Sequence, residues 1–310
     1  MAGIRRVVLT GGTGLIGRAL SQYLAERGVA EQRILTRNPK RQLLLPPGAR
    51  LVPWRAEPDA LAEVLQGVDA VVHMAGANVA QRRWTDAYKA EIYRSRVETG
   101  RALARALAAV PESQRPRVFV QMSAVGYYGD RGDAILTEDE PPGQDFLARL
   151  CVDWEAATQS VQDFGVRWIA TRTGIVLSRE GGALPLMARP MRWFVGGPLA
   201  DGQFYIPWIH IMDQVRAMAF LMNHPEARGP FNLTAPEPVT NEVFIRTLAR
   251  VLRRPAWFRV PRWALRLVLG EMADAMLASL RAVPKRLLDL GFTFRFPDLT
   301  SALQDLFAQG

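Results

Sequence analysis

Three glycines at a spacing of three residues, Gly11, Gly14 and Gly17, give the strongest indication of chemistry in this chain. They follow a short apolar run that ends at Thr10 and precede a segment of helical periodicity, residues 15–27. Between a strand and a helix, such glycines allow a tight turn and a close approach of backbone N–H groups to a pyrophosphate. The helix N-terminus adds oriented donors and a partial positive charge. The residues predicted to contact a dinucleotide there are Gly11, Thr13, Gly14, Leu15 and Ile16.

The end of the second predicted strand distinguishes between the two nicotinamide cofactors. An NAD site would place Asp or Glu there for the ribose hydroxyls, whereas this chain has Arg37 and Asn38, with Arg37 26 residues after Gly11. A guanidinium can pair bidentately with a 2′-phosphate. These residues therefore predict NADP(H), with Lys40 or Arg41 as helpers. The alternative is that Arg37 is an ordinary surface arginine.

Small residues follow the fourth predicted strand, residues 69–75. Ala75, Gly76 and Ala77 would let a cofactor ribose lie against the backbone, and they are predicted to contact the cofactor. The alternative is that they serve packing alone.

Strands and helices alternate through the first half of the chain, which is typical of a parallel sheet covered on both faces. We predict an α/β fold, a Rossmann-like doubly wound parallel sheet with a smaller helix-rich C-terminal substrate domain. The NADP-binding domain is predicted over residues 1–177, and the cleft-forming, C-terminal helical domain over 178–310. Residues 206–235 can also belong to the core of the NADP-binding domain. The predicted strands are 5–10, 33–36, 50–53, 69–75, 117–122, 166–172 and 230–234; the predicted helices are 15–27, 58–67, 85–110, 144–164 and 212–223, with apolar helical faces at 242–252, 262–281 and 299–308.

Composition narrows the class of protein. The 310 residues are 49% hydrophobic and 22% charged, which is ordinary globular usage. No apolar run reaches membrane-spanning length, and the first residues lack the pattern of a signal peptide. The single cysteine, Cys151, excludes an intrachain disulfide. We expect a cytoplasmic protein that does not bind membranes.

The net charge of +9 would suit polyanions. The arginines are spread along the chain, however, and no basic run has interleaved aromatic residues. We therefore predict no specific nucleic-acid partner. His73, His210 and His224 have no paired ligand spacing, and Cys151 adds none, so no metal site is predicted.

Together these residues resemble the extended short-chain dehydrogenase/reductase superfamily, in its NAD(P)-dependent epimerase/dehydratase group. More narrowly, the chain is similar to the branch called "epimerase family protein", sometimes labelled cell-division-inhibitor-like. Beside Thr10–Gly17, the segments that carry the resemblance are 74–78, 83–85 with Lys89, 95–97 with Thr99, 123–129, 137–138, 154–155, 172–177, 208–211, 270–272, 284–287 and 291–292.

The resemblance implies a Rossmann-like domain that binds NADP(H), with a C-terminal region that closes over the nicotinamide. It also implies a tyrosine proton donor with a lysine four residues later, assisted by Ser or Thr. This chain departs from that pattern, because Leu147 and Cys151 stand where the tyrosine and lysine would be. The usual Ser/Thr position is Ala124, with Ser123 one residue earlier.

Two interpretations remain open. In the first, the chain is an oxidoreductase or epimerase that acts by hydride transfer on an unidentified small molecule, as a monomer or homodimer. Its catalytic candidates are then Ser123, Tyr127 and Tyr128, because loops at the carboxyl ends of parallel strands form such sites. His210 is a further acid–base candidate, and Cys151 would be a reactive thiol only if exposed. In the second, the chain binds NADP(H) without turnover, as a redox sensor or a regulatory partner-binding protein.

Overall fold

Seven parallel strands form the centre of the molecule. The structure is a computed structural model that describes residues 3–308. The strand order is β11-β7-β5-β4-β1-β2-β3, and each neighbouring pair is parallel. The strands are β1 Arg6–Thr10, β2 Glu31–Thr36, β3 Ala49–Pro53, β4 Ala70–His73, β5 Val118–Ala124, β7 Arg167–Thr173 and β11 Gly229–Leu233. The predicted Rossmann-like sheet is thereby confirmed.

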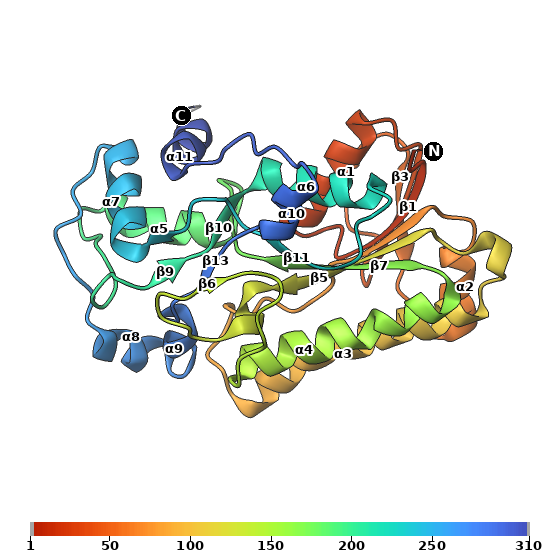
Figure 1. Ribbon diagram of the computed structural model, residues 1–310, viewed down its shortest axis with the longest axis horizontal. Coiled ribbons are helices and arrows are strands. Elements are labelled where there is room, and N and C mark those ends of the chain that lie inside the picture. Colours follow the sequence, from red (N-terminus) through yellow and green to blue (C-terminus); the bar gives the residue numbers. More distant parts are fainter. Residues whose placement is uncertain (1–2, 309–310) are drawn as a thin grey trace.

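Helices cover both faces of this sheet (Figure 1). On one face lie α1 Leu15–Glu26, α6 Ile211–Asn223 and α10 Lys285–Asp289; on the other lie α2 Pro58–Leu65, α3 Asp86–Ala109 and α4 Phe146–Gln159. In β1, Val7 and Leu9 join the core beneath α1 and α6, while Val8 joins the opposite core beneath α2 and α3. Because both faces are covered, the strand is apolar at consecutive positions rather than at alternate ones.

The strand order reverses between β1 and β4, since the chain builds outward from β1 to β3 and then returns to β4. Ligands of doubly wound sheets bind outside the carboxyl ends of the strands at this reversal. The turn after Thr10 and the loop after His73 both leave the sheet at this point.

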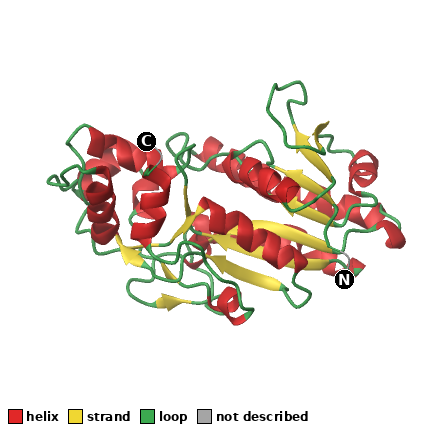
Figure 2. Cartoon of the chain, turned by 90° about the horizontal axis from the view of Figure 1, so that it is seen from above, coloured by secondary structure: helices red, strands yellow, loops and turns green. Residues whose placement is uncertain are grey.

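Apart from β11, α6 and α10, the C-terminal region lies beyond the carboxyl ends of the central strands, at the left in Figure 1 and again in the rotated view of Figure 2. Its helices pack around a third apolar core that includes Phe204, Trp208, Phe244 and Leu303. The remaining elements are the short strands β6 Ile135–Leu136, β8 Ile175–Leu177, β9 Tyr205–Ile206, β10 Trp208–His210, β12 Val239–Thr240 and β13 Arg281–Ala282, the helices α5 Ala183–Arg192, α7 Asn241–Leu252, α8 Arg262–Leu269, α9 Met272–Met276 and α11 Leu299–Phe307, and the 3-10 turns η1 Glu112–Gln114, η2 Val125–Tyr128 and η3 Ser160–Phe164.

Two predicted segments differ from the structure. The apolar face predicted over 262–281 is divided into α8 and α9, because Gly270 adopts a φ of +63° and ends α8. The segment 178–210, for which the sequence predicts no helix or strand, contains α5 and two short strands. Among the helices of residues 3–308, none combines the length and the apolar character needed to cross a bilayer.

Candidate functional site

The turn between β1 and α1 has the tight geometry that its glycines predict. Gly11 has a φ of +70°, and a Cβ there would lie 2.6 Å from the carbonyl oxygen of Met74. A Cβ on Gly17 would lie 2.4 Å from the carbonyl oxygen of Gly11. Side chains at these two positions would therefore collide with backbone.

Gly14, by contrast, is exposed and is the N-cap residue of α1. A Cβ there would meet only the carbonyl oxygen of Gly11, at 3.3 Å. Within the described chain, no side chain caps α1 and its first turn has no acidic residue. The N-terminus of α1 thus offers open backbone donors and a partial positive charge to an anion. This cradle fits a dinucleotide pyrophosphate.

Thr10 ties this turn to the loop after β4. Its Oγ1 accepts hydrogen bonds from the backbone N–H groups of Met74 and Ala75, at 3.1 and 3.2 Å, and lies 2.6 Å from Nδ1 of His73. The hydroxyl then donates to Nδ1, which leaves the imidazole proton on Nε2. Burial lowers the pKa of His73 to about 4, so the imidazole is neutral at pH 7. His73 is thus a core residue, and Ala75, Gly76 and Ala77 are fixed beside the turn.

The residues predicted to select the cofactor lie on an exposed turn after β2. Arg37, Asn38, Lys40 and Arg41 are all exposed. The turn is closed by a hydrogen bond from the backbone N–H of Arg41 to the carbonyl of Asn38, at 3.2 Å. Since the sequence has no acidic residue between Glu31 and Glu57, the positive charge of this turn is not neutralised by the turn itself. The guanidinium of Arg37 is free to meet a phosphate.

Two of the three catalytic candidates lie in a buried polar network instead of an open cleft. The Ser123 hydroxyl donates to Glu155 at 2.7 Å, and the fully buried Tyr128 hydroxyl donates to Oδ1 of Asn232 at 2.7 Å. Arg172 bonds both carboxylate oxygens of Glu155 at 3.0 Å and reaches the Tyr128 hydroxyl at 3.2 Å. Burial raises the pKa of Tyr128 to about 12. These contacts favour a structural role for Ser123 and Tyr128.

Tyr127 differs from its neighbour. It is part-buried, and the Arg172 guanidinium carbon lies 3.4 Å from its ring centroid. Within residues 3–308 the Tyr127 hydroxyl has no hydrogen-bond partner. It is therefore the candidate hydroxyl that remains available to a ligand.

The positions that would hold the family's tyrosine and lysine are apolar. Leu147 packs with Trp84, Phe146 and Met122 in the cluster around Tyr88 and Trp154. Cys151 is buried, and burial raises the pKa of its thiol to about 12, so it is a protonated thiol at neutral pH. Cys151 supplies neither charge nor a nucleophile here.

His210 also has a structural role. It precedes α6, and its Nδ1 accepts the backbone N–H of Met212 at 3.0 Å, so it is the N-cap of that helix. Asp213, in the first turn of α6, accepts the backbone N–H groups of Arg295 and Phe296. Burial lowers the pKa of His210 to about 4.

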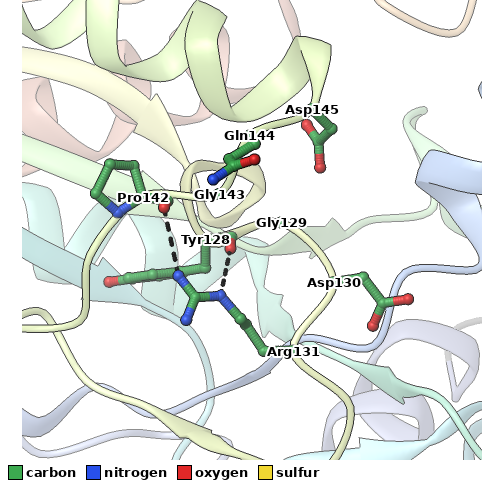
Figure 3. Close-up of a pocket in the computed structure, with 8 residues that line it drawn as sticks. All are labelled: Tyr128, Gly129, Asp130, Arg131, Pro142, Gly143, Gln144 and Asp145. Atoms are coloured by element: carbon green, nitrogen blue, oxygen red, sulfur yellow. Dashed lines mark hydrogen bonds between the residues drawn. The ribbon is translucent and has the colours of Figure 1, made fainter.

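A cavity of about 460 Å³ opens beside Tyr128 (Figure 3). Its lining comes from the loops at 128–131 and 142–145. Arg131 closes one wall, because its guanidinium donates to the carbonyl oxygens of Tyr128 and Pro142. None of its described lining residues belongs to the glycine turn or to the loop after β4, so this cavity is separate from the cofactor cradle.

Sequence reasoning did not single out Arg96, Glu138, Glu155, Arg172 or Asn232 as site residues. A signal was present for Arg96, which lies four residues from both Ile92 and Gly100 on the buried face of α3. An arginine on the buried face of a helix is unusual, because charged side chains are mostly exposed. Among the described residues, no cluster of His, Cys, Asp and Glu could hold a metal ion.

This fold and this glycine turn define a nicotinamide-dinucleotide-binding protein of the doubly wound class. The model of the NAD dependent epimerase/dehydratase family matches residues 7–234, and the chain belongs to that family. A second model, a domain of unknown function (DUF1731), matches residues 260–306. An epimerase family protein of Mycobacterium bovis is 38% identical over 299 residues, 96% of each chain, and one of Staphylococcus aureus is 35% identical over 309 residues, 99% of this chain and 100% of that one.

Solved structures extend the comparison. The human epimerase family protein, isoform 2, solved with NADPH, has a TM-score of 0.86 and 34% identity, and the alignment covers 97% of this chain and 98% of that one. A nucleoside-diphosphate sugar epimerase of Corynebacterium glutamicum has a TM-score of 0.77 and 34% identity, and 60% of its chain is covered. A UDP-N-acetylglucosamine 4-epimerase of Bacillus cereus, at 16% identity, shares the fold, with a TM-score of 0.76.

Proposed function

We propose that this chain binds NADP(H) and is an oxidoreductase or epimerase that acts by hydride transfer on an unidentified small molecule. The observation that carries the proposal is the glycine cradle at the strand-order reversal, with the exposed Arg37 at the end of the adjacent β2. The human relative solved with NADPH supports the same cofactor. A bound nicotinamide supplies or accepts a hydride at its C4 carbon.

The roles of the chain's own residues follow from their places. Gly11 and Gly14, with Thr13, Leu15 and Ile16, would hold the pyrophosphate at the N-terminus of α1. Arg37, with Asn38, would bind the 2′-phosphate. The loop of Ala75, Gly76 and Ala77 would lie against the ribose. Tyr127 is the proposed proton donor, because its hydroxyl has no structural partner within the described residues.

A specific observation favours the second candidate function, a non-catalytic NADP(H)-binding sensor. Ser123 and Tyr128 are held in the buried network of Arg172 and Glu155, and Leu147 and Cys151 provide no acid or base. The two candidates differ only in turnover, and both require the cofactor site.

Cofactor binding is the first test. The chain has eight tryptophans, so energy transfer to the nicotinamide can report binding of NADPH and NADH. We expect NADPH to bind at least tenfold more tightly than NADH, and Arg37→Asp to remove that preference by weakening NADPH. Arg105→Asp, an equal charge change at an exposed site on α3, is the control. Equal affinity of the unchanged protein for both cofactors would contradict the assignment of Arg37.

Turnover is tested next. Net oxidation of NADPH during a screen of carbonyl compounds, or conversion of a nucleotide sugar to its epimer without net oxidation of the cofactor, would support an enzyme if the rate is lost in Tyr127→Phe. Tight NADPH binding without turnover on any compound would favour the sensor. A cytoplasmic location, a monomeric or homodimeric state and the lack of nucleic-acid and membrane partners are part of the same proposal. For the location alone, the support is the single cysteine, which suits a reducing compartment.

A further inference from the structure

Arg96 places a positive charge beside the loop that follows β4. Its guanidinium carbon lies 4.9 Å from the ring centroid of Trp154. On the loop side, a Cβ added to Gly76 would come within 2.8 Å of the same carbon, so a side chain at this position would displace the guanidinium. One Nη donates to the carbonyl oxygens of Ala77, at 3.0 Å, and Ile92, at 3.2 Å. These contacts fix the guanidinium between an indole and the backbone of the loop.

The charge of Arg96 is not balanced by a carboxylate. None of the ion pairs formed within residues 3–308 includes Arg96. Its electrostatic neighbours are the Cys151 thiol, whose pKa burial raises to about 12, and the Tyr88 hydroxyl, which donates a hydrogen bond to the carbonyl oxygen of Asn78. Glu155, one turn further along α4 from Cys151, is neutralised by Arg172. A part-buried guanidinium without a counter-ion projects its positive potential into the adjoining space.

The sheet order places this charge at one end of the proposed cofactor site. The 2′-phosphate end lies over β2, and the pyrophosphate lies between β1 and β4. The rest of the cofactor must extend the other way, across β4 toward β5 and Tyr127. Arg96 borders that part of the path, because it contacts Gly76 and Ala77 after β4 and lies within electrostatic reach of Cys151, where the family's lysine would stand. Arg96 of α3 thus places a positive charge near the position on α4 where the family's lysine would stand.

We propose that Arg96 makes the nicotinamide end of this cleft prefer NADPH, whose ring is neutral, over NADP⁺, whose ring carries a positive charge. The inference rests on the proposed NADP(H) site. The two forms of the cofactor have the same phosphates, so the glycine turn and Arg37 act on both alike. The difference in affinity therefore isolates the charge at the ring. A protein with this preference is poised for reduction, or for sensing the reduced cofactor.

The test compares dissociation constants of NADPH and NADP⁺ for the full-length protein, measured by calorimetry at one ionic strength. We expect the unchanged protein to bind NADPH at least fivefold more tightly than NADP⁺. In Arg96→Gln, which keeps an amide donor for the Ala77 carbonyl, this ratio should fall several-fold toward one. Arg96→Lys keeps the charge and should retain a higher ratio than Arg96→Gln. Arg94→Gln, at an exposed site one half-turn away on α3, should leave the ratio unchanged.

The possible results distinguish a failure of the cofactor site from a failure of the role of Arg96. If the unchanged protein binds neither form, the proposed cofactor site itself is wrong. If it binds both forms but NADP⁺ at least as tightly as NADPH, the role of Arg96 is wrong while the cofactor site stands, and this measurement needs no variant to fold. If Arg96→Gln is folded by circular dichroism and keeps the ratio of the unchanged protein, Arg96 is only a structural clamp on the loop. An equal fall in Arg94→Gln would assign the effect to net charge and contradict the proposal.

Discussion

At the scale of single residues, the glycines of the cofactor turn are not equivalent. A Cβ on Gly17 would lie 2.4 Å from the carbonyl oxygen of Gly11 and 2.5 Å from the Cα of Gly12, whereas Gly14 faces outward. Gly14→Val should therefore fold and lose NADPH binding, because its methyl groups occupy the approach of the pyrophosphate. Gly17→Val should lose stability, by several kcal/mol, since packed backbone would have to move. Thermal denaturation with NADPH titration separates the two effects. Normal NADPH binding by a folded Gly14→Val would show that the phosphate site is not at this turn.

Tyr127 and Tyr128 are adjacent in sequence and differ in environment. Tyr128→Phe leaves the buried side-chain oxygen Oδ1 of Asn232 without this donor, so we expect a loss of about 1–3 kcal/mol in the free energy of unfolding. Its NADPH affinity should not change. Tyr127→Phe should have the opposite profile, with stability within about 0.5 kcal/mol of the unchanged protein and loss of turnover. Urea denaturation and cofactor titration of both variants test this contrast, which equal stability losses would contradict.

The sequence predicted the geometry of the glycine turn well and the surroundings of Ser123 and Tyr128 poorly, for a physical reason. The glycine turn is local: three glycines, a strand and a helix lie within one stretch of chain, so their spacing specifies their geometry. The network of Ser123, Glu155 and Arg172 joins β5, α4 and β7, and only the sheet order brings those elements together. Spacing along the chain could not show that the Ser123 hydroxyl is already occupied.

At the scale of elements, the ion pair between Glu155 and Arg172 holds α4 against β7. Burial alone would lower the pKa of Arg172, but the two bonds to Glu155 outweigh burial and raise it. Glu155→Gln would leave a buried guanidinium without its counter-ion, so we expect a loss of about 3–5 kcal/mol. Asp289→Asn, which breaks the exposed pair with Lys285, is the matched control and should cost less than about 0.5 kcal/mol. Chemical denaturation measures both, and similar losses in the two variants would mean that burial does not strengthen the Glu155 pair.

The predicted ends of helices agree with the structure where a local signal, such as a capping residue, marks the end. The predicted helix 85–110 is α3, whose N-cap Thr85 accepts the backbone N–H of Tyr88. The predicted helical face at 262–281 failed because apolar periodicity continues across Gly270, while the backbone does not. The helix-rich region was therefore predictable as a class, and its division into short helices was not.

At the scale of the whole molecule, two buried histidines couple stability to pH. Burial lowers the pKa of both His73 and His210 to about 4, from a usual value of 6.5. Asp305 lies 3.4 Å from Nε2 of His210 and would raise its pKa, but burial outweighs this attraction. Because the folded pKa lies below the unfolded one, the unfolded state takes up protons first as the pH falls. The stabilisation is complete above about pH 6.5 and declines toward pH 4.

Each histidine can therefore contribute up to about 3 kcal/mol of this loss, since its folded-state pKa is about 4 and the usual value is 6.5. Glu138 acts in the opposite sense, because burial raises its pKa, so the total slope alone does not identify the histidines. His210→Gln should reduce the fall in unfolding free energy between pH 7 and pH 4.5 relative to the unchanged protein, with His224→Gln as the matched control. Urea denaturation across that range gives the slopes. If His210→Gln has the same pH dependence of unfolding free energy as the unchanged protein, the imidazole takes up its proton equally well in the folded protein. The assignment of His210 as a neutral N-cap of α6 would then be wrong.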